Sequence, residues 1–234
     1  MMTNKSVSEK AIEWVRVNKK KIIDHFASDA VCPPSEEPFS IFMAGSPGAG
    51  KTESSIAIVE MVKKRGDAIV RIDPDEIRKL IPQYTGSNTD AVKGASFLAV
   101  EKLYDYVLKT GKSMILDSTF TPYKKIEGNV RRSVSKGRTI AIIYIDQDPL
   151  VAWHLTKERE KIEGRSIPRD FFIRTLFESR ENVRKIKEQF GDHVVLRVIQ
   201  KDYTKQTQHV IEDVKFIDDV VQIKYSVDDL KELL

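Results

Sequence analysis

The sequence predicts an α/β protein with a doubly wound, mainly parallel sheet flanked by helices. Short apolar runs alternate with amphipathic stretches along the whole chain, which is the order expected of strands joined by helical crossovers. The run at 139–145 (TIAIIYI) is apolar throughout, as in a strand covered on both faces. A length of 234 residues with 41% hydrophobic content fits one domain with a sizeable core.

Each element has a local signal. Residues 7–28 have helical spacing, and Cys32-Pro33-Pro34-Ser35 then breaks the chain, so we divide it into an N-terminal helical extension (1–36) and a main domain (37–234). We expect strands at 39–44, 68–72, 114–116, 139–145 and 194–199. We expect helices at 51–64, from Pro74, and at 89–110, 122–136, 148–163 and 168–190.

Three details of this assignment can be compared with the structure. Asp73 should cap the helix that Pro74 begins. Residues 201–213 are interpreted as a polar connection or helix, followed by an apolar stretch at 220–225 and a short C-terminal helix. On the helix at 51–64, the inward side should carry Ile56, Val59, Met61 and Val62.

The turn after the first strand carries the G-x-x-x-x-G-K-[ST] pattern of a P-loop, which predicts an α/β fold of the P-loop NTPase type. Glycines let backbone N–H groups approach phosphate oxygens, and the following helix directs its positive end at the same anion. The lysine would reach the β- and γ-phosphates, and the threonine hydroxyl would ligate Mg²⁺. The expected nucleotide-binding residues are Gly45, Ser46, Pro47, Gly48, Ala49, Gly50, Lys51, Thr52 and Glu53. No N-K-x-D motif for guanine is present, so we expect ATP.

Polar residues after the next strands are candidates for catalysis, because ligands of such sheets sit at the carboxyl ends of the strands. Asp75 could accept the proton of an acceptor hydroxyl, or could simply be a helix-start aspartate satisfied by backbone N–H groups. Asp117 could bind Mg²⁺ or orient the acceptor, or be a turn residue. Thr119 could bond a substrate hydroxyl or cap the next helix. Glu101 lies beside an apolar helix face and needs a partner, either a ligand hydroxyl or an internal arginine.

The segment 154–168 (HLTKEREKIEGRSIP) is expected to be a helical lid. Lys157, Arg159, Lys161 and Arg165 surround a break at Gly164 between two helices, and guanidinium forks suit phosphate oxygens. The alternative is an ordinary charged helix hairpin.

Composition narrows the classes of protein. A net charge of +4 suits anionic ligands and gives no argument for a nucleic-acid partner. Cys32 is the only cysteine, and the four histidines lack metal-ligand spacing. No apolar run reaches the roughly 18 residues of a membrane span. We therefore expect a soluble, cytoplasmic protein without a membrane segment.

Across residues 39–180, the sequence resembles the zeta-toxin family of P-loop kinases. The resemblance rests on GSPGAGKT (45–52), IDPDEIR (72–78), Glu101, LDST (116–119) and the arginines in KERE and GRSIP. It implies that Asp75 is the proton acceptor and that Arg159 and Arg165 contact the transferred phosphate together with Lys51. It further implies a substrate side made of Asp73, Arg78, Glu101, Asp117 and Thr119, with Thr52 and Asp117 at the metal.

The function that this resemblance implies is ATP- and Mg²⁺-dependent phosphorylation of a hydroxyl on a UDP-activated amino sugar such as UDP-N-acetylglucosamine. A small protein antitoxin is an implied partner. The family's E-G-T-x-R becomes Asp117-Ser118-Thr119-Phe120-Thr121 here, so the departure falls on the substrate side. Two alternatives stay open: a kinase of polynucleotide ends or of another small metabolite, and a non-catalytic nucleotide-binding regulatory module.

Overall fold

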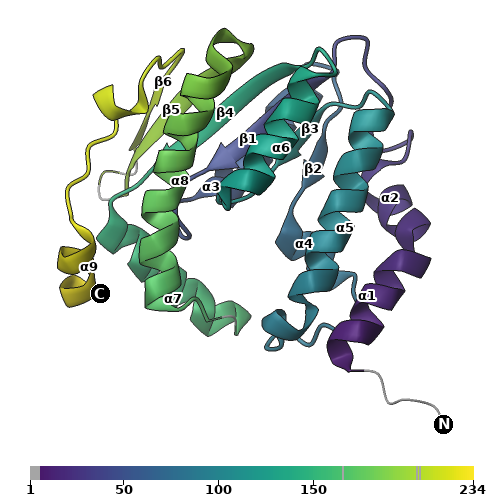
Figure 1. Cartoon of the computed structure of the whole chain (residues 1–234), viewed down its shortest axis with the longest axis horizontal. Helices are drawn as coiled ribbons and strands as arrows, with labels where there is room; N and C mark the ends of the chain where they lie inside the picture. The colour runs from purple at the N-terminus through teal and green to yellow at the C-terminus, as the bar shows by residue number, and fades with distance from the viewer. Residues whose placement is uncertain (1–5, 165, 204, 206) are drawn as a thin grey trace.

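A six-stranded sheet with the order β2-β3-β1-β4-β5-β6 forms the centre of the molecule (Figure 1). The computed structural model describes residues 6–164, 166–203, 205 and 207–234. β1 to β5 are parallel and β6 runs antiparallel to β5, which confirms the mainly parallel sheet. The strands are β1 (Phe39–Ala44), β2 (Val70–Ile72), β3 (Met114–Leu116), β4 (Thr139–Asp146), β5 (Val194–Asp202) and β6 (Thr207–Ile211).

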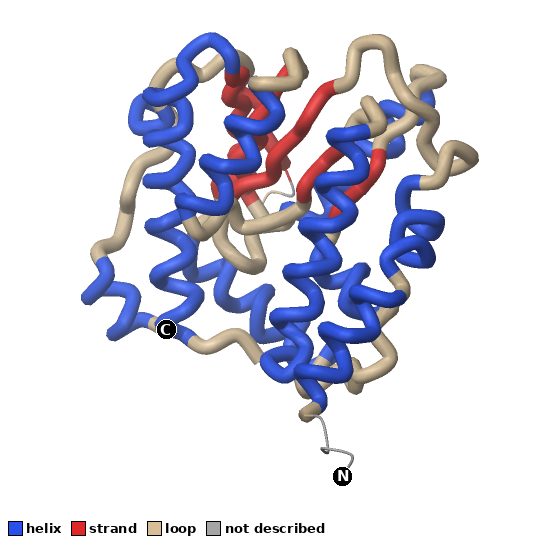
Figure 2. The backbone as a smooth tube through the Cα atoms, turned by 45° about the vertical axis from the view of Figure 1, so that its right-hand side comes forward, coloured by secondary structure: helices blue, strands red, loops and turns tan. Residues whose placement is uncertain are grey.

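Helices cover both faces of this sheet. On one face lies α3 (Lys51–Lys64), and on the other lie α5 (Thr89–Lys109), α6 (Tyr123–Val134) and α8 (Arg169–Phe190). α1 (Val7–Val17) and α2 (Lys19–Ala27) pack against α5. The remaining elements are α4 (Pro74–Lys79), α7 (Pro149–Glu163), α9 (Val227–Leu233) and two 3₁₀ turns, Gly191–His193 and Ile217–Asp219. Figure 2 shows that the helices extend beyond the ends of the strands. Within the described ranges, no helix is long and apolar enough to cross a membrane.

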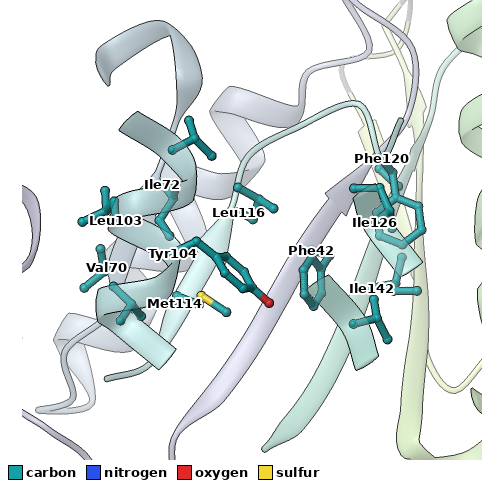
Figure 3. Close-up of a cluster of buried hydrophobic side chains, with 14 of the residues drawn as sticks. Phe42, Val70, Ile72, Leu103, Tyr104, Met114, Leu116, Phe120, Ile126 and Ile142 are labelled. Atoms are coloured by element: carbon teal, nitrogen blue, oxygen red, sulfur yellow. The ribbon is translucent and has the colours of Figure 1, made fainter. Parts of the chain in front are cut away.

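The larger part of the core lies between the sheet and the helices α5, α6 and α8 (Figure 3). Tyr104 of α5 is fully buried there, and its hydroxyl donates to the Asn129 carbonyl of α6 at 2.7 Å. Burial raises the pKa of Tyr104 to about 12, so the phenol stays neutral and remains a donor. Side chains of α1 and α2 (Ala11, Val15, Ile22) belong to the same core, and the division of the chain at residue 36 stays a prediction.

The structure corrects the prediction for 7–28. Two helices replace the single one, because Asn18 ends α1 and directs both its backbone N–H and its side-chain amide to the Trp14 carbonyl. The prediction for 201–213 is also wrong, since β5 continues to Asp202 and β6 follows it. All of β6 except its last residue is exposed, so the strand is formed by backbone pairing with β5. Its sequence lacks the apolar alternation that would predict a strand.

The inward side of α3 also differs from the prediction. Ile56 and Met61 are 43% and 52% exposed, whereas Ile58, Val59 and Val62 pack on the sheet. Among the described helices, only α3 packs on this face of the sheet, so only a narrow arc of it is buried.

We expect Tyr104→Phe to lower the free energy of unfolding by about 1–2 kcal/mol, because the change removes the two buried hydrogen bonds of the hydroxyl, to the Asn129 carbonyl and to Ser133 Oγ, and leaves the ring packing intact. Urea unfolding measures the difference. Tyr203→Phe is the matched control, since Tyr203 is 57% exposed and its change should stay within ~0.5 kcal/mol. Equal effects of the two changes would contradict the role of the buried hydroxyl.

Candidate active site

The P-loop is held so tightly that two of its glycines cannot be replaced without displacing backbone. Gly48 has φ +72°, and a Cβ there would lie 2.0 Å from the Ala152 carbonyl oxygen of α7. Gly45 has φ +132°, and its Cβ would lie 2.7 Å from the Ile145 carbonyl oxygen. The Gly45 N–H donates to Ser179 Oγ of α8 at 2.7 Å. The loop after β1 is therefore enclosed by the end of β4, by α7 and by α8.

Lys51 is buried inside this loop. Its amine donates to the carbonyl oxygens of Gly45 at 3.0 Å and Ser46 at 2.6 Å. Burial lowers the pKa of Lys51 to about 8; the charge of Asp117 opposes this shift and that of Arg159 adds to it. Asp75 also acts on the same amine, so the structure brings the predicted lysine, both carboxylates and the lid arginine into one electrostatic environment.

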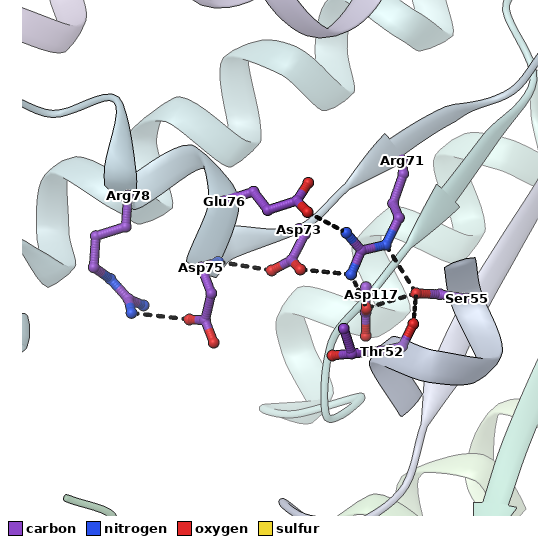
Figure 4. Close-up of polar contacts among 8 residues, drawn as sticks. All are labelled: Thr52, Ser55, Arg71, Asp73, Asp75, Glu76, Arg78 and Asp117. Carbon is purple, nitrogen blue, oxygen red and sulfur yellow. Dashed lines mark hydrogen bonds and ion pairs between the residues drawn. The ribbon is translucent and has the colours of Figure 1, made fainter. Parts of the chain in front are cut away.

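Arg71 of β2 connects the carboxylates at the ends of β2 and β3 (Figure 4). Its Nη2 lies 2.6 Å from Asp73 Oδ2 and 2.6 Å from Asp117 Oδ2. Its Nε donates to Ser55 Oγ of α3 at 2.8 Å, and its Nη1 pairs with Glu76 Oε1 of α4 at 2.8 Å. Arg71 is not among the site residues predicted from the sequence, although a charged side chain inside an apolar strand is a usable signal.

Asp73 is the N-cap of α4, as predicted, and accepts the Asp75 N–H at 2.7 Å through Oδ1. Its other oxygen accepts from Arg71, so both oxygens already have protein partners. Burial raises the pKa of Asp73 to about 6 in spite of Arg71, because desolvation of the carboxylate outweighs the ion pair.

Asp75 follows in the first turn of α4 with a side chain that is 39% exposed. Its Oδ1 pairs at 2.8 Å with Nη1 of Arg78, which is buried and lies over the ring of Tyr84. Arg78 therefore holds the Asp75 carboxylate in one orientation. The expected contact of Arg78 with a substrate stays a prediction.

Thr52 and Asp117 supply oxygen donors of the kind that Mg²⁺ prefers. Asp117 Oδ2 accepts from Arg71 and from Ser55 Oγ, whose hydroxyl also lies 2.9 Å from the Thr52 carbonyl. Asp117 Oδ1 takes no hydrogen bond from the part of the chain that the structure describes, so it is the oxygen left for a cation. In that same part, no group of three or more His, Cys, Asp or Glu side chains is arranged for a metal. The donor set fits an ion that takes its other ligands from phosphates and water.

The loop after β3 presents two hydroxyls. Thr119 Oγ1 and Thr121 Oγ1 lie 2.9 Å apart, and between them Phe120 adopts φ +62° with its ring fully buried. The Asn182 side-chain amide of α8 donates to the Phe120 carbonyl at 2.9 Å. These contacts hold a backbone conformation that non-glycine residues rarely adopt.

Glu101 has a lysine as its partner. Its Oε1 pairs with Lys125 Nζ of α6, and its side chain is 49% exposed. Its protein partner is therefore a lysine and not the internal arginine that the sequence left open, and a role in substrate binding stays a prediction.

The segment predicted to be a lid (154–168) comprises the end of α7 and the connection to α8, and its role as a lid stays a prediction. Arg165 lies outside the described residues. Lys157 and Lys161 pair with glutamates of their own helix, Glu160 and Glu158. Arg159, exposed on α7, is the basic residue of this helix that acts on Lys51.

A cavity of about 640 Å³ lies on the β4 and β5 side of the P-loop, opposite the carboxylates that follow β2 and β3. It is lined by the ends of β4 and β5, by α8 and by the segment 220–225. Lys201, one of its lining residues, donates to the Gly50 carbonyl at 3.0 Å and so connects β5 to the P-loop. The sequence analysis did not identify Lys201, since nothing local relates it to Gly50.

Fold and site together define a protein with a P-loop kinase-like fold. Residues 23–210 match the family model of the zeta toxin, and the chain belongs to this family. No curated protein sequence gave a match.

Three solved structures show the same fold at low identity. The first concerns the PezAT chromosomal toxin-antitoxin system of Streptococcus pneumoniae, with a TM-score of 0.65, 18% identity and coverage of 100% of this chain and 88% of the other. The second is AvrRxo1-ORF1:-ORF2 with ATP, with a TM-score of 0.60, 16% identity and coverage of 88% and 65%, so this chain spans less than two thirds of that one. The third is the Pnkp1/Rnl/Hen1 RNA repair complex, with a TM-score of 0.50, 15% identity and coverage of 77% and 50%.

Gly48→Ala should destabilise the protein by about 2 kcal/mol or more, because it combines a positive φ with a clash against the Ala152 carbonyl. Gly128→Ala in α6 is the matched control: no atom lies within 4 Å of its added Cβ, and it should stabilise by about 0.5–1 kcal/mol. Chemical denaturation measures both changes. A neutral Gly48→Ala would contradict the close contact between the P-loop and α7.

Proposed function

We propose that this protein is an ATP- and Mg²⁺-dependent kinase that phosphorylates a hydroxyl of a UDP-activated amino sugar such as UDP-N-acetylglucosamine. The observation that carries the proposal is the environment of the Lys51 amine. It lies within the electrostatic reach of Asp75, Asp117 and Arg159 at once. A phosphate-binding lysine, an acceptor-side carboxylate and a lid arginine are the parts that phosphoryl transfer needs, since its catalysis is mostly positioning and charge stabilisation.

The chain's own residues divide the reaction between them. Asp75 takes the proton of the acceptor hydroxyl, whose oxygen bonds to the γ-phosphorus while the bond from that phosphorus to the β,γ-bridging oxygen breaks and ADP leaves. Lys51 exchanges the Gly45 and Ser46 carbonyls for phosphate oxygens, and Arg159 and Arg165 neutralise the transferring group. Thr52 and Asp117 would hold Mg²⁺, which supplies charge neutralisation and alignment of the phosphates.

The acceptor and the nucleoside would occupy opposite sides of the P-loop. Asp75, Thr119 and Glu101 lie on the side of β2 and β3, where Glu101 would exchange Lys125 for a sugar hydroxyl. The cavity at the ends of β4 and β5 is large enough for a nucleoside. Membership of the zeta toxin family supports the choice of a nucleotide sugar as acceptor.

A small protein partner is part of the proposal. The structures similar to this chain include a toxin-antitoxin system and a two-protein complex. We infer that a small antitoxin protein would regulate this chain.

The proposal predicts that purified protein with ATP, Mg²⁺ and UDP-N-acetylglucosamine produces a sugar nucleotide heavier by one phosphoryl group in mass spectrometry. Asp75→Asn should reduce this turnover at least about 100-fold while ATP affinity stays nearly unchanged, because only the proton acceptor is lost. Asp90→Asn is the control, being the same change at an exposed first-turn aspartate of α5.

Three other outcomes separate the alternatives. Full turnover by Asp75→Asn would reject the assignment of the base. Phosphorylation of oligonucleotide ends in place of the sugar nucleotide would make the chain a polynucleotide kinase. ATP binding without transfer to any acceptor would favour a regulatory module.

ATP binding should also take up protons at alkaline pH. The ligand-free pKa of Lys51 is about 8, and phosphates facing the amine raise it, so at pH 8.5 roughly three quarters of a proton should bind with each nucleotide. At pH 6.5 the amine is already charged and this uptake disappears. Calorimetry in buffers of different ionisation enthalpy measures it, and Lys51→Arg, whose side chain is always charged, should abolish the uptake at pH 8.5.

A further inference from the structure

Arg71 has contacts that the proposed reaction does not use. Its side chain is 10% exposed, as is that of Asp73, and the side chain of Asp117 is 5% exposed. Four polar groups from α3, α4 and the turns after β2 and β3 converge on one guanidinium, as Figure 4 shows. Such a concentration of contacts on a strand residue needs an explanation beyond packing.

The Nη2 atom of Arg71 is a counter-ion that Asp73 and Asp117 share. This one nitrogen lies 2.6 Å from Asp73 Oδ2 and 2.6 Å from Asp117 Oδ2. Both distances are those of short, charge-assisted hydrogen bonds, so a single cationic group lies between the two carboxylates. Without a cation between them, two buried carboxylates would repel each other strongly.

The structure limits how Asp117 can meet a metal. Arg71 and Ser55 both hold Oδ2, while Oδ1 takes no hydrogen bond from the described residues. Both oxygens of Asp73 are directed at protein donors, because Oδ1 caps α4 and Oδ2 accepts from Arg71. One carboxylate oxygen and one hydroxyl are a poor site for a divalent cation until phosphates add more ligands.

We propose that Arg71 is a positioning residue that takes the place of a cation between Asp73 and Asp117, so that the protein binds a divalent ion only together with the nucleotide. This rests on the proposed function in one respect, namely that the ion arrives with ATP. A guanidinium suits the task better than an ammonium, because its planar fork reaches both carboxylates, Ser55 and Glu76 in fixed directions. It also fixes α4, and with it Asp75, relative to the P-loop helix.

The test is Mn²⁺ binding in the absence of nucleotide and acceptor, measured by electron paramagnetic resonance on wild type, Arg71→Met and Arg71→Met/Asp73→Asn. Wild type should bind no Mn²⁺ in the micromolar range. Arg71→Met should gain one site at least about tenfold tighter than any in wild type, because a dicarboxylate is exposed to the ion. The double variant loses one carboxylate, keeps a capping side chain at the start of α4, and should lose the gained site.

Stability gives a second readout that an ordinary structural role would not produce. Arg71→Met should melt well below wild type, since it leaves two buried charges without a partner, and Mn²⁺ should raise its Tm while leaving that of wild type unchanged. Arg71→Lys, which keeps the charge, should gain no Mn²⁺ site.

Several results would overturn the proposal. These are Mn²⁺ binding by nucleotide-free wild type, a folded Arg71→Met with no gained site, an undiminished site in the double variant, or an Arg71→Met that stays unfolded in millimolar Mn²⁺. Because no ATP or acceptor is present, these results are independent of whether the chain proves to be a kinase.

Discussion

The charge balance of a buried cluster is the constraint on which the site depends. Parallel strands bring Lys51, Arg71, Asp73 and Asp117 to one edge of the sheet, where all four side chains are almost excluded from water. Two cations and two anions are tolerable there, whereas one uncompensated charge would cost several kcal/mol. An arriving triphosphate makes the cluster strongly negative, so additional positive charge has to accompany it. In the proposed function this charge would come from Arg159 on α7 and from the metal ion proposed to sit at Thr52 and Asp117.

Those parts of the fold that local chemistry determines were predictable from the sequence. The P-loop, the Asp73 cap and the helices α3 and α5 depend on neighbours within a few residues, and the structure has them at the expected positions. The errors fall where tertiary contacts decide. β6 is a strand because its backbone pairs with β5, and Ile56 and Met61 are exposed because no other described helix packs on the α3 face of the sheet. Neither fact is encoded in the periodicity of the segment itself.

The same distinction holds for the site. Asp75, Asp117 and Lys51 could be identified, because each follows a strand and the strand ends of a parallel sheet lie at one edge. Their partners could not. Arg71 meets Asp117 across 46 residues, Lys125 meets Glu101 across 24, and Lys201 meets Gly50 across 151. Arg71 stands out as a charge inside an apolar strand, whereas the other residues have ordinary local explanations, and in each pair only the fold identifies the partner. The motif thus predicted which groups could react, and the structure adds which groups hold them.

The strength of these contacts ranks the predicted substrate-side residues. Asp73 is buried, caps α4 and pairs with Arg71, so a substrate could engage it only by breaking a network worth several kcal/mol. Glu101 is half exposed and its pair with Lys125 is worth about 1 kcal/mol or less, so a sugar hydroxyl can replace that partner at little cost. Thr119 need only exchange its bond to Thr121. Of the residues predicted to contact an acceptor, Glu101 and Thr119 therefore have partners that are easy to exchange, whereas Asp73 is committed to Arg71 and to the cap of α4. If the proposed function holds, a change of acceptor could arise at Glu101 and Thr119 without disturbing the buried contacts around Lys51.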